Sequence, residues 1–390
     1  MAFMYFFTIT DKIEFIMFKL FIFTLFFMMS VSSSCNDHEP VSENLIQTEE
    51  LALDIDTLAT GLENPWSIAF LPDGRILIAE RPGRLRIFED GRLRDEPVPG
   101  LPDIWAHGQG GFLDVVLHPE YEDNSRIYIA YAEPRGNGGN TSIARGIFDG
   151  SRLTDVEVIF RGEPATDRGH HFGSRIVFDD DGYMFTTIGD RGVMGNAQML
   201  ENHNGKVIRL HDNGSVPSDN PFVDVQGAKP EIWTYGHRNI QGMGLHPQTR
   251  ELWTHEHGPR GGDEINLISK GENYGWPEVT HGINYNGTII TEDTTRNGMV
   301  DPVLHWTPSI APCGLGFVSG DRYPGWQHNM LVGALAGLHI HRVVLENDRV
   351  VHTEYLLEGF ARFRDVREGP DGYIYALTEA PGLLIRLIPR

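Results

Sequence analysis

The sequence is poor in cysteine, because only Cys35 and Cys313 occur among its 390 residues. A framework of disulfide bonds is therefore excluded, and the chain is long enough to bury a large core without one. Positive charge is also scarce, since 32 Lys and Arg stand against 54 Asp and Glu and give a formal net charge of −22. Such a surface repels phosphate backbones and anionic lipid head groups, so nucleic acid is not an expected partner.

Long apolar runs are missing as well. The apolar run from Leu20 to Met29 is shorter than the roughly 20 residues that a membrane-spanning helix needs. It follows Lys19 and precedes small residues up to Cys35, an order that is typical of an export signal. The segment Ser32–Cys35 resembles a bacterial lipoprotein cleavage site, although Ser32 stands where an apolar residue is usual.

These features predict three regions. Residues 1–35 are expected to be an export or lipoprotein signal, residues 36–55 a polar, flexible tether, and residues 56–390 one folded domain. The protein is then exported to the periplasm or the outer surface and is tethered to a membrane through a lipid on Cys35. A plainly cleaved signal with an incidental Cys35 is the alternative. With Cys35 lipidated, Cys313 has no disulfide partner and is expected to be a small buried side chain.

A repeated plan runs through the folded region, which shows no long segment with helical spacing of apolar residues. Each unit has a short apolar strand, a turn such as Pro-Asp-Gly or His-Pro, and a second β-rich run. The first strands of the six units begin at Trp66, Leu113, Arg175, Gly242, Gly314 and Asp365. The spacing leaves room for four strands per unit. We therefore predict an all-β fold, a six-bladed β-propeller of four-stranded antiparallel blades, with an irregular β-sandwich as the alternative.

Polar, glycine-rich stretches beside these first strands are the candidate functional segments. Residues 105–111 precede the second unit; their glycines allow close approach of a ligand, and Gln109 offers a donor and an acceptor. His170 and His171 precede the third unit. Histidine is the usual general base near neutral pH, and adjacent residues of a strand point to opposite faces. Only one of the two is therefore expected to face the channel.

Two further stretches carry arginine. Arg238 and Asn239 lead into the fourth unit and suit a planar ligand rich in oxygen. Arg362 and Arg364 open the sixth unit and share a strand face, so that an anion is expected between them unless both are solvated at the surface. Together these stretches predict a pocket for an anionic ligand with several carboxylates, beside a substrate with a hydroxyl group.

Metal binding is open to two readings. His255 and His257 alternate along one strand and could hold a transition metal. A hard cation bound by backbone oxygens around Gly258 and Pro259, with acidic residues nearby, is at least as consistent with the sequence.

Six strings in this order resemble the PQQ-dependent aldose sugar dehydrogenases, relatives of soluble quinoprotein glucose dehydrogenase. They are WAHGQGG, HFGSR, EIWTYGHRN, EHGPRGGDEIN, NYGWP and RFRDV, and the similarity covers the chain from about Gly61 to its C-terminus. The resemblance implies that residues 56–390 form a catalytic propeller with PQQ and Ca²⁺ on its axis. It further implies oxidation of a sugar at the anomeric carbon to the lactone, with electrons passed to an external quinone or cytochrome.

The resemblance also implies roles for individual residues. His171 matches the general base, Gln109 the amide near the substrate oxygen, and Arg238 and Asn239 the residues that bond the quinone oxygens. Arg238 is therefore expected to be catalytic together with His171 and Gln109. Arg362 and Arg364 match the residues that bind the cofactor's carboxylates. The carbonyl oxygens of Gly258 and Pro259 match those that bind its calcium ion. The carbonyl oxygens of Glu264 and Tyr274 match part of a second, structural calcium site.

Two positions depart from that pattern. Ala336 stands where the family usually has a lysine that contacts PQQ, and His170 stands where Asn or Asp usually precedes the base. Two other functions are therefore kept open. One is a calcium-dependent propeller lactonase or other hydrolase in which His171 activates water, and the other is a tethered, non-catalytic sugar-binding propeller.

Overall fold

The computed structural model describes residues 45–390. The predicted signal, Cys35 and the first part of the predicted tether lie outside the described residues. Within residues 45–390, no helix is both long and apolar enough to cross a membrane.

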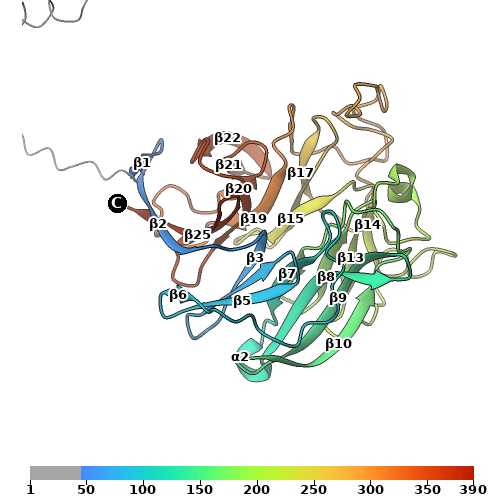
Figure 1. The fold of residues 1–390 in the computed structure, drawn as a ribbon. Coiled ribbons are helices and arrows are strands. Elements are labelled where there is room, and N and C mark those ends of the chain that lie inside the picture. The colour runs from blue at the N-terminus through green and yellow to red at the C-terminus, as the bar shows by residue number, and fades with distance from the viewer. Residues whose placement is uncertain (1–44) are drawn as a thin grey trace, which may run out of the picture. The chain divides into compact units, whose positions relative to one another are not determined.

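Residues 45–390 form six antiparallel sheets (Figure 1), and the predicted six-bladed β-propeller is confirmed. The first blade comprises β3 (Pro65–Phe70), β4 (Ile76–Glu80), β5 (Arg84–Glu89) and β6 (Arg92–Leu93). The second comprises β7 (Phe112–Leu117), β8 (Arg126–Arg135), β9 (Gly138–Phe148) and β10 (Leu153–Arg161). The third comprises β11 (Ile176–Phe178), β12 (Met184–Ile188), β13 (Lys206–Leu210) and β14 (Ile232–Tyr235). The next two comprise β15 (Ile240–Leu245), β16 (Leu252–Glu256), β17 (Asp263–Leu267) and β18 (Leu304–Trp306); and β19 (Pro312–Phe317), β20 (Met330–Ala334), β21 (Ile340–Glu346) and β22 (Arg349–Leu356).

The sixth blade joins the two ends of the described chain. Its strands run in the order β1 (Leu45–Gln47), β2 (Ala52–Thr60), β25 (Gly382–Pro389), β24 (Ile374–Glu379) and β23 (Phe363–Glu368). The first strands of the blades contact one another in the order β3, β7, β11, β15, β19 and β23, and β23 contacts β3 again. The pairing of β2 with β25 therefore closes the ring and removes two free sheet edges.

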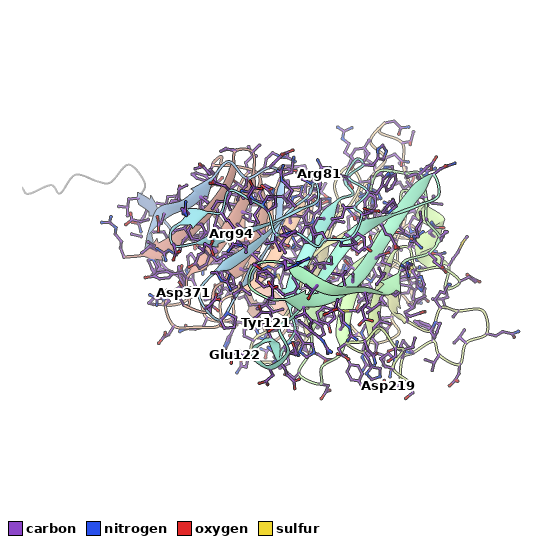
Figure 2. All side chains as sticks on the ribbon, turned by 60° about the horizontal axis from the view of Figure 1, so that its bottom comes forward. Arg81, Arg94, Tyr121, Glu122, Asp219 and Asp371 are labelled. Atoms are coloured by element: carbon purple, nitrogen blue, oxygen red, sulfur yellow. The ribbon has the colours of Figure 1, made fainter. Side chains whose placement is uncertain are left out.

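Two short helices of the described residues lie in connections between strands. Helix α2 (Tyr121–Asn124) joins β7 to β8, and its Tyr121 packs against the core between the first two blades (Figure 2). A 3₁₀ helix (Met194–Gln198) lies in the connection from β12 to β13.

The predicted tether is wrong over its last part. Residues 45–47 and 52–55 are strand residues, and Leu53 is fully buried in the core between the fifth and sixth blades. The segment reads as a tether because it is short and acidic. Its strand is stabilised instead by pairing with β25 at the far end of the sequence, which local composition does not show.

The inner strands share a local irregularity. In β3, β7, β15, β19 and β23 the pairing register shifts by one residue near the start of the strand. A bulge of this kind re-aims the side chains next to it. In the sixth blade the shift falls at Arg364, and in the fourth at Gln241.

A buried ion network ties the inner strands together. Arg175 lies 3.7 Å from Asp114 of β7 and 3.3 Å from Asp365 of β23, and Arg367 bonds to the same two carboxylates at 3.1 and 2.9 Å. The carboxylate of Asp365 also accepts the backbone N–H of Ile68 in β3. Since these groups come from different blades, the network fixes the blades around the axis.

Leu53→Ala tests the ring closure. The substitution is expected to lower the free energy of unfolding by about 2–5 kcal/mol, because a buried leucine is truncated in a packed core. Thr57→Ala in the same strand, at an exposed position, is the control and is expected to cost about 0.5 kcal/mol. Urea denaturation followed by circular dichroism measures both. Equal, negligible effects would show that this segment is a tether after all.

Candidate active site

His171 lies in the loop that leads into β11, and its conformation decides where both histidines point. Its φ of 58° is in the left-handed region, so the backbone does not alternate as a strand would at this point. His170 and His171 consequently line one cavity, with ring centroids 4.8 Å apart. The prediction that only one of the two faces the channel is therefore wrong, since it assumed strand geometry.

The loop is held in this conformation by neighbours from the β12–β13 connection. The buried guanidinium group of Arg191 donates hydrogen bonds to the carbonyl oxygens of Arg168 (2.6 Å) and His170, and it stacks 3.4 Å from the ring of Phe172. Gly189 must lack a side chain, because a Cβ there would lie 2.3 Å from the carbonyl oxygen of His171.

Asp190, which the sequence analysis did not single out, orients the ring of His171. Its carboxylate accepts a hydrogen bond from His171 Nδ1 (2.6 Å), the Trp276 indole N–H (2.9 Å) and the Gly192 N–H (2.6 Å). In the neutral ring the proton therefore sits on Nδ1, and Nε2 carries the lone pair. The sequence offered one signal for Asp190, because Gly189 and Asp190 directly follow β11 and β12, the two inner strands of the third blade.

Burial keeps His171 neutral. Desolvation and the nearby positive charge of Arg238 together lower the pKa of His171 to about 4, although the hydrogen bond to Asp190 raises it. The pKa of Asp190 is lowered below its ordinary value by His171 and Arg238, although burial opposes this. At neutral pH the pair is thus an uncharged imidazole beside a carboxylate, which is the state that a general base requires.

The cavity in front of His171 has a volume of about 400 Å³. Gln109, Arg238, Trp276 and Tyr285 share its wall with the two histidines. The side-chain oxygen of Gln109 accepts the backbone N–H of His171 at 2.9 Å, which leaves its NH₂ group free for a ligand. The structure thus brings Gln109, His171 and Arg238, the three residues predicted to be catalytic, to one cavity.

Arg238 and Asn239 are fixed from behind by Glu256. The Glu256 carboxylate accepts the backbone N–H of Arg238 (2.5 Å) and of Asn239 (3.3 Å) and bonds to His237 (2.9 Å). The Asn239 side-chain oxygen accepts the N–H of Gly173 at 3.1 Å. Arg238 itself donates to the carbonyl oxygen of His257 at 3.0 Å and keeps further donors for a ligand.

Arg362 and Arg364 lie together, as predicted, but an anion of the chain itself stands between them. Glu379 of β24 bonds to Arg362 at 3.0 Å and to Arg364 at 3.2 Å. Arg364 is buried against the ring of Trp66 (3.9 Å), whereas the side chain of Arg362 is 43% exposed. The expectation that an external anion is required between the two arginines is corrected by this ion pair.

The His255 and His257 pair does not form a metal site. His255 Nε2 donates to the carbonyl oxygen of Gly314 and His257 Nε2 to that of Pro312, each at 2.9 Å. Both rings are thereby tied to β19. Over residues 45–390, no group of three or more His, Cys, Asp or Glu side chains is arranged to hold a metal ion.

Cys313 is buried, as expected, but its surroundings are polar. Its thiol lies 3.2 Å from Arg364 Nη1 and 3.7 Å from His257 Nε2. Burial raises the pKa of the thiol above its ordinary value. Cys313 therefore packs directly against Arg364.

The residues predicted to bind calcium lie around β17 and the loops that flank it. Gly258 donates its N–H to Asp263 (2.8 Å), and among the hydrogen bonds of residues 45–390 none ends on the carbonyl oxygens of Gly258 or Pro259. Burial and the neighbouring carboxylate of Glu256 raise the pKa of Glu264 well above its ordinary value. Tyr274 stacks on His237 with centroids 4.6 Å apart. Calcium binding by these residues stays a prediction.

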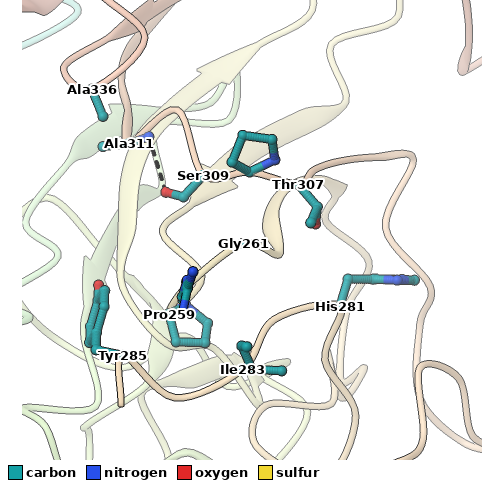
Figure 3. Close-up of a pocket in the computed structure, with 11 residues that line it drawn as sticks. Pro259, Gly261, His281, Ile283, Tyr285, Thr307, Ser309, Ala311 and Ala336 are labelled. Carbon is teal, nitrogen blue, oxygen red and sulfur yellow. Dashed lines mark hydrogen bonds between the residues drawn. The ribbon is translucent and has the colours of Figure 1, made fainter. Parts of the chain in front are cut away.

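A second, larger cavity of about 760 Å³ adjoins the first through Tyr285. Figure 3 shows Pro259, Ser309, Ala311 and Ala336 around it, with Tyr285 at one side. The wall of this cavity therefore contains both Pro259, which is predicted to bind calcium, and Ala336, which stands where the family usually has a lysine.

Comparison with known proteins identifies relatives over almost the whole described region. The model of the glucose / sorbosone dehydrogenase family matches residues 62–386. The aldose sugar dehydrogenase YliI of Escherichia coli strain K12 is 43% identical over 346 residues, which cover 87% of this chain and 93% of that protein.

Solved structures show the same likeness. The soluble aldose sugar dehydrogenase of Escherichia coli in its apo form is 41% identical, with a TM-score of 0.83 over 87% of this chain and 100% of that one. The PQQ-bound aldose sugar dehydrogenase of Streptomyces coelicolor is 26% identical, with a TM-score of 0.73 over 87% of this chain and 98% of that one.

Asp190→Asn tests how His171 is held. Loss of the carboxylate removes the interaction that raises the pKa of His171, so that pKa is expected to fall below about 4. The NH₂ group of the asparagine can also donate a hydrogen bond to His171 Nδ1, which favours the tautomer with the proton on Nε2. Nitrogen NMR of the histidine rings measures both effects, with the exposed Asp181→Asn as control. A His171 ring that titrates near pH 6.5 in the unaltered protein would contradict this account.

Proposed function

Because the chain belongs to the glucose / sorbosone dehydrogenase family, we propose that it is a PQQ-dependent dehydrogenase that oxidises aldose sugars at the anomeric carbon to lactones. Membership of this family confirms the predicted relationship and makes the protein an oxidoreductase. It favours this function over the lactonase and the non-catalytic binding protein that the sequence left open.

The observation that carries the proposal is the neutral imidazole of His171 in the smaller cavity. Nε2 bears a lone pair, Asp190 fixes the tautomer, and Arg238 and Gln109 place donors on the same wall. An oxygen of a substrate that meets Nε2 can also meet these donors. The arrangement suits removal of a proton from a sugar hydroxyl group.

The arginine pair beside Leu335 and Ala336 fits a planar cofactor with carboxylates. Arg364 Nε is buried and has no partner, and Arg362 keeps donors exposed beyond its bond to Glu379. Guanidinium groups bind carboxylates with paired hydrogen bonds, so Arg362 and Arg364 would hold the carboxylates of PQQ and Arg238 and Asn239 its quinone oxygens. Ala336 contributes no charge there.

A calcium ion fits the same region. The carbonyl oxygens of Gly258 and Pro259, which accept none of the hydrogen bonds in residues 45–390, are hard oxygen ligands of the kind that Ca²⁺ prefers. We propose that they bind the calcium ion of the cofactor, and that the carbonyl oxygens of Glu264 and Tyr274 contribute to a second, structural site.

The chain's own residues then perform three tasks. His171 Nε2 takes the proton from the anomeric hydroxyl group, and Asp190 stabilises the imidazolium that forms. Gln109 donates through its NH₂ group to a substrate oxygen, and Arg238 supplies positive charge where negative charge develops. PQQ, when bound, supplies a quinone that accepts the hydride from the anomeric carbon.

The setting of the enzyme is also a proposal. The apolar run and Cys35 support export and a lipid anchor outside the cytoplasm. Electrons from the sugar then pass to an external quinone or cytochrome.

Reconstitution with PQQ and Ca²⁺ tests the function. The purified protein is expected to reduce a redox dye when an aldose is added. His171→Ala is expected to lower kcat by a factor of about 10²–10⁴, because the base is lost, while PQQ binding by absorbance titration is retained. His211→Ala, which changes a histidine on none of the site elements, is the control. Absence of both PQQ binding and dye reduction in the unaltered protein would refute the proposal.

The pH dependence of kcat/KM tests the state of the base. A pKa of about 4 leaves His171 neutral across pH 6–8, so kcat/KM is expected to be flat there and to fall as the pH drops through about 4. An unperturbed histidine would give the fall near pH 6.5. Return of full activity after transfer from low pH to pH 7 separates protonation from unfolding.

A further inference from the structure

Glu379 bridges Arg362 and Arg364, the two arginines that are predicted to bind the cofactor's carboxylates. One carboxylate oxygen bonds to Arg362 Nε at 3.0 Å and the other to Arg364 Nη2 at 3.2 Å. The glutamate side chain is only 17% exposed. Arg362 is further fixed by its bond to the carbonyl oxygen of Leu335 (3.1 Å), directly beside Ala336.

Glu379 cancels one of the two positive charges of this cluster. Two guanidinium groups and one carboxylate leave a net charge of one positive, and Ala336 adds nothing. The arginines hold the pKa of Glu379 below its ordinary value against the effect of burial, so the carboxylate stays ionised at neutral pH. An anionic ligand at Arg362 and Arg364 therefore meets a negative charge of the protein as well.

We propose that Glu379 is a built-in counter-ion of the cofactor site, which stabilises the empty arginine pair and weakens the binding of anionic ligands. The inference rests on the proposed function for the identity of the ligand. The ion pair itself is independent of it. The cofactor carboxylates and the Glu379 carboxylate compete for the same two positive charges.

The physical reason is the cost of two adjacent like charges in a partly buried place. Without Glu379, the empty site would hold two unpaired guanidinium groups, and a ligand would relieve that repulsion on binding. With Glu379 the repulsion is already relieved. Less free energy is then left for the ligand, and fewer ions are released when it binds.

Glu379→Gln tests this directly, because the amide keeps the shape and removes the charge. PQQ, titrated with Ca²⁺ present and followed by absorbance, is expected to bind about 10-fold more tightly to the variant. The affinity is also expected to depend more steeply on NaCl concentration. The empty variant is expected to unfold at a lower temperature than the unaltered protein, since its arginines lose their partner.

Glu133→Gln is a matched control. Glu133 also bridges two arginines, Arg135 and Arg161, and its side chain is 15% exposed, but all three residues belong to β8 and β10 of the second blade. Its loss is expected to leave the PQQ affinity unchanged. Ala336→Lys is a second test at an exposed position, and the added positive charge is expected to tighten PQQ binding by a similar factor.

Sodium sulfate serves as a probe that does not depend on PQQ. Compared with NaCl at equal ionic strength, it is expected to raise the unfolding temperature of Glu379→Gln more than that of the unaltered protein or of Glu133→Gln. If PQQ binds to none of the proteins but this sulfate effect is seen, the counter-ion stands and the proposed function fails. Weaker or unchanged PQQ binding by Glu379→Gln would overturn the counter-ion, since Glu379 would then position the arginines for the ligand.

Discussion

The contacts of Arg175 with three other blades are the constraint on which the site depends. This buried side chain donates to the backbone carbonyl oxygens of Gln241 (2.8 Å) and Arg364 (3.3 Å) and pairs with the carboxylates of Asp114 and Asp365. Four blades are thereby fixed relative to one another at the axis. A charge in such a place is tolerated only with close partners, so the network also specifies one arrangement of the blades.

The candidate site is built on residues directly next to this network. Gln241 follows Ile240 and the Arg238–Asn239 pair, and Arg364 precedes Asp365. His171 lies four residues before Arg175 in the same loop. The base and the cofactor arginines are therefore placed by short stretches of backbone that start from one rigid point, which is what a preorganised site requires.

Much of the fold could be predicted because hairpin chemistry repeats along the chain. All six predicted first strands are inner strands of blades, and all six second runs are the strands beside them. The errors fall where the decisive contact is distant or the backbone irregular. Strand β2 depends on its pairing with β25. In that pairing Leu53 lies opposite Pro389, which is more than 320 residues later in the sequence. His171 departs from the strand pattern because its own φ is positive. Asp190 and Glu379 contact residues of other strands or loops, and no local sequence pattern indicates those contacts.

The same principle explains why Glu379 and Asp190 serve their partners in different ways. Each is a carboxylate beside a functional group, and the spacing of residues in the sequence predicted neither of them. Asp190 meets an uncharged ring, so its negative charge orients His171 and raises the ring's affinity for a proton. Glu379 meets two groups that are already charged, so its effect is to cancel charge that a ligand would otherwise use. A carboxylate near a base thus strengthens the step in which the base acts, whereas a carboxylate near an anion-binding pair stabilises the protein before the anion arrives.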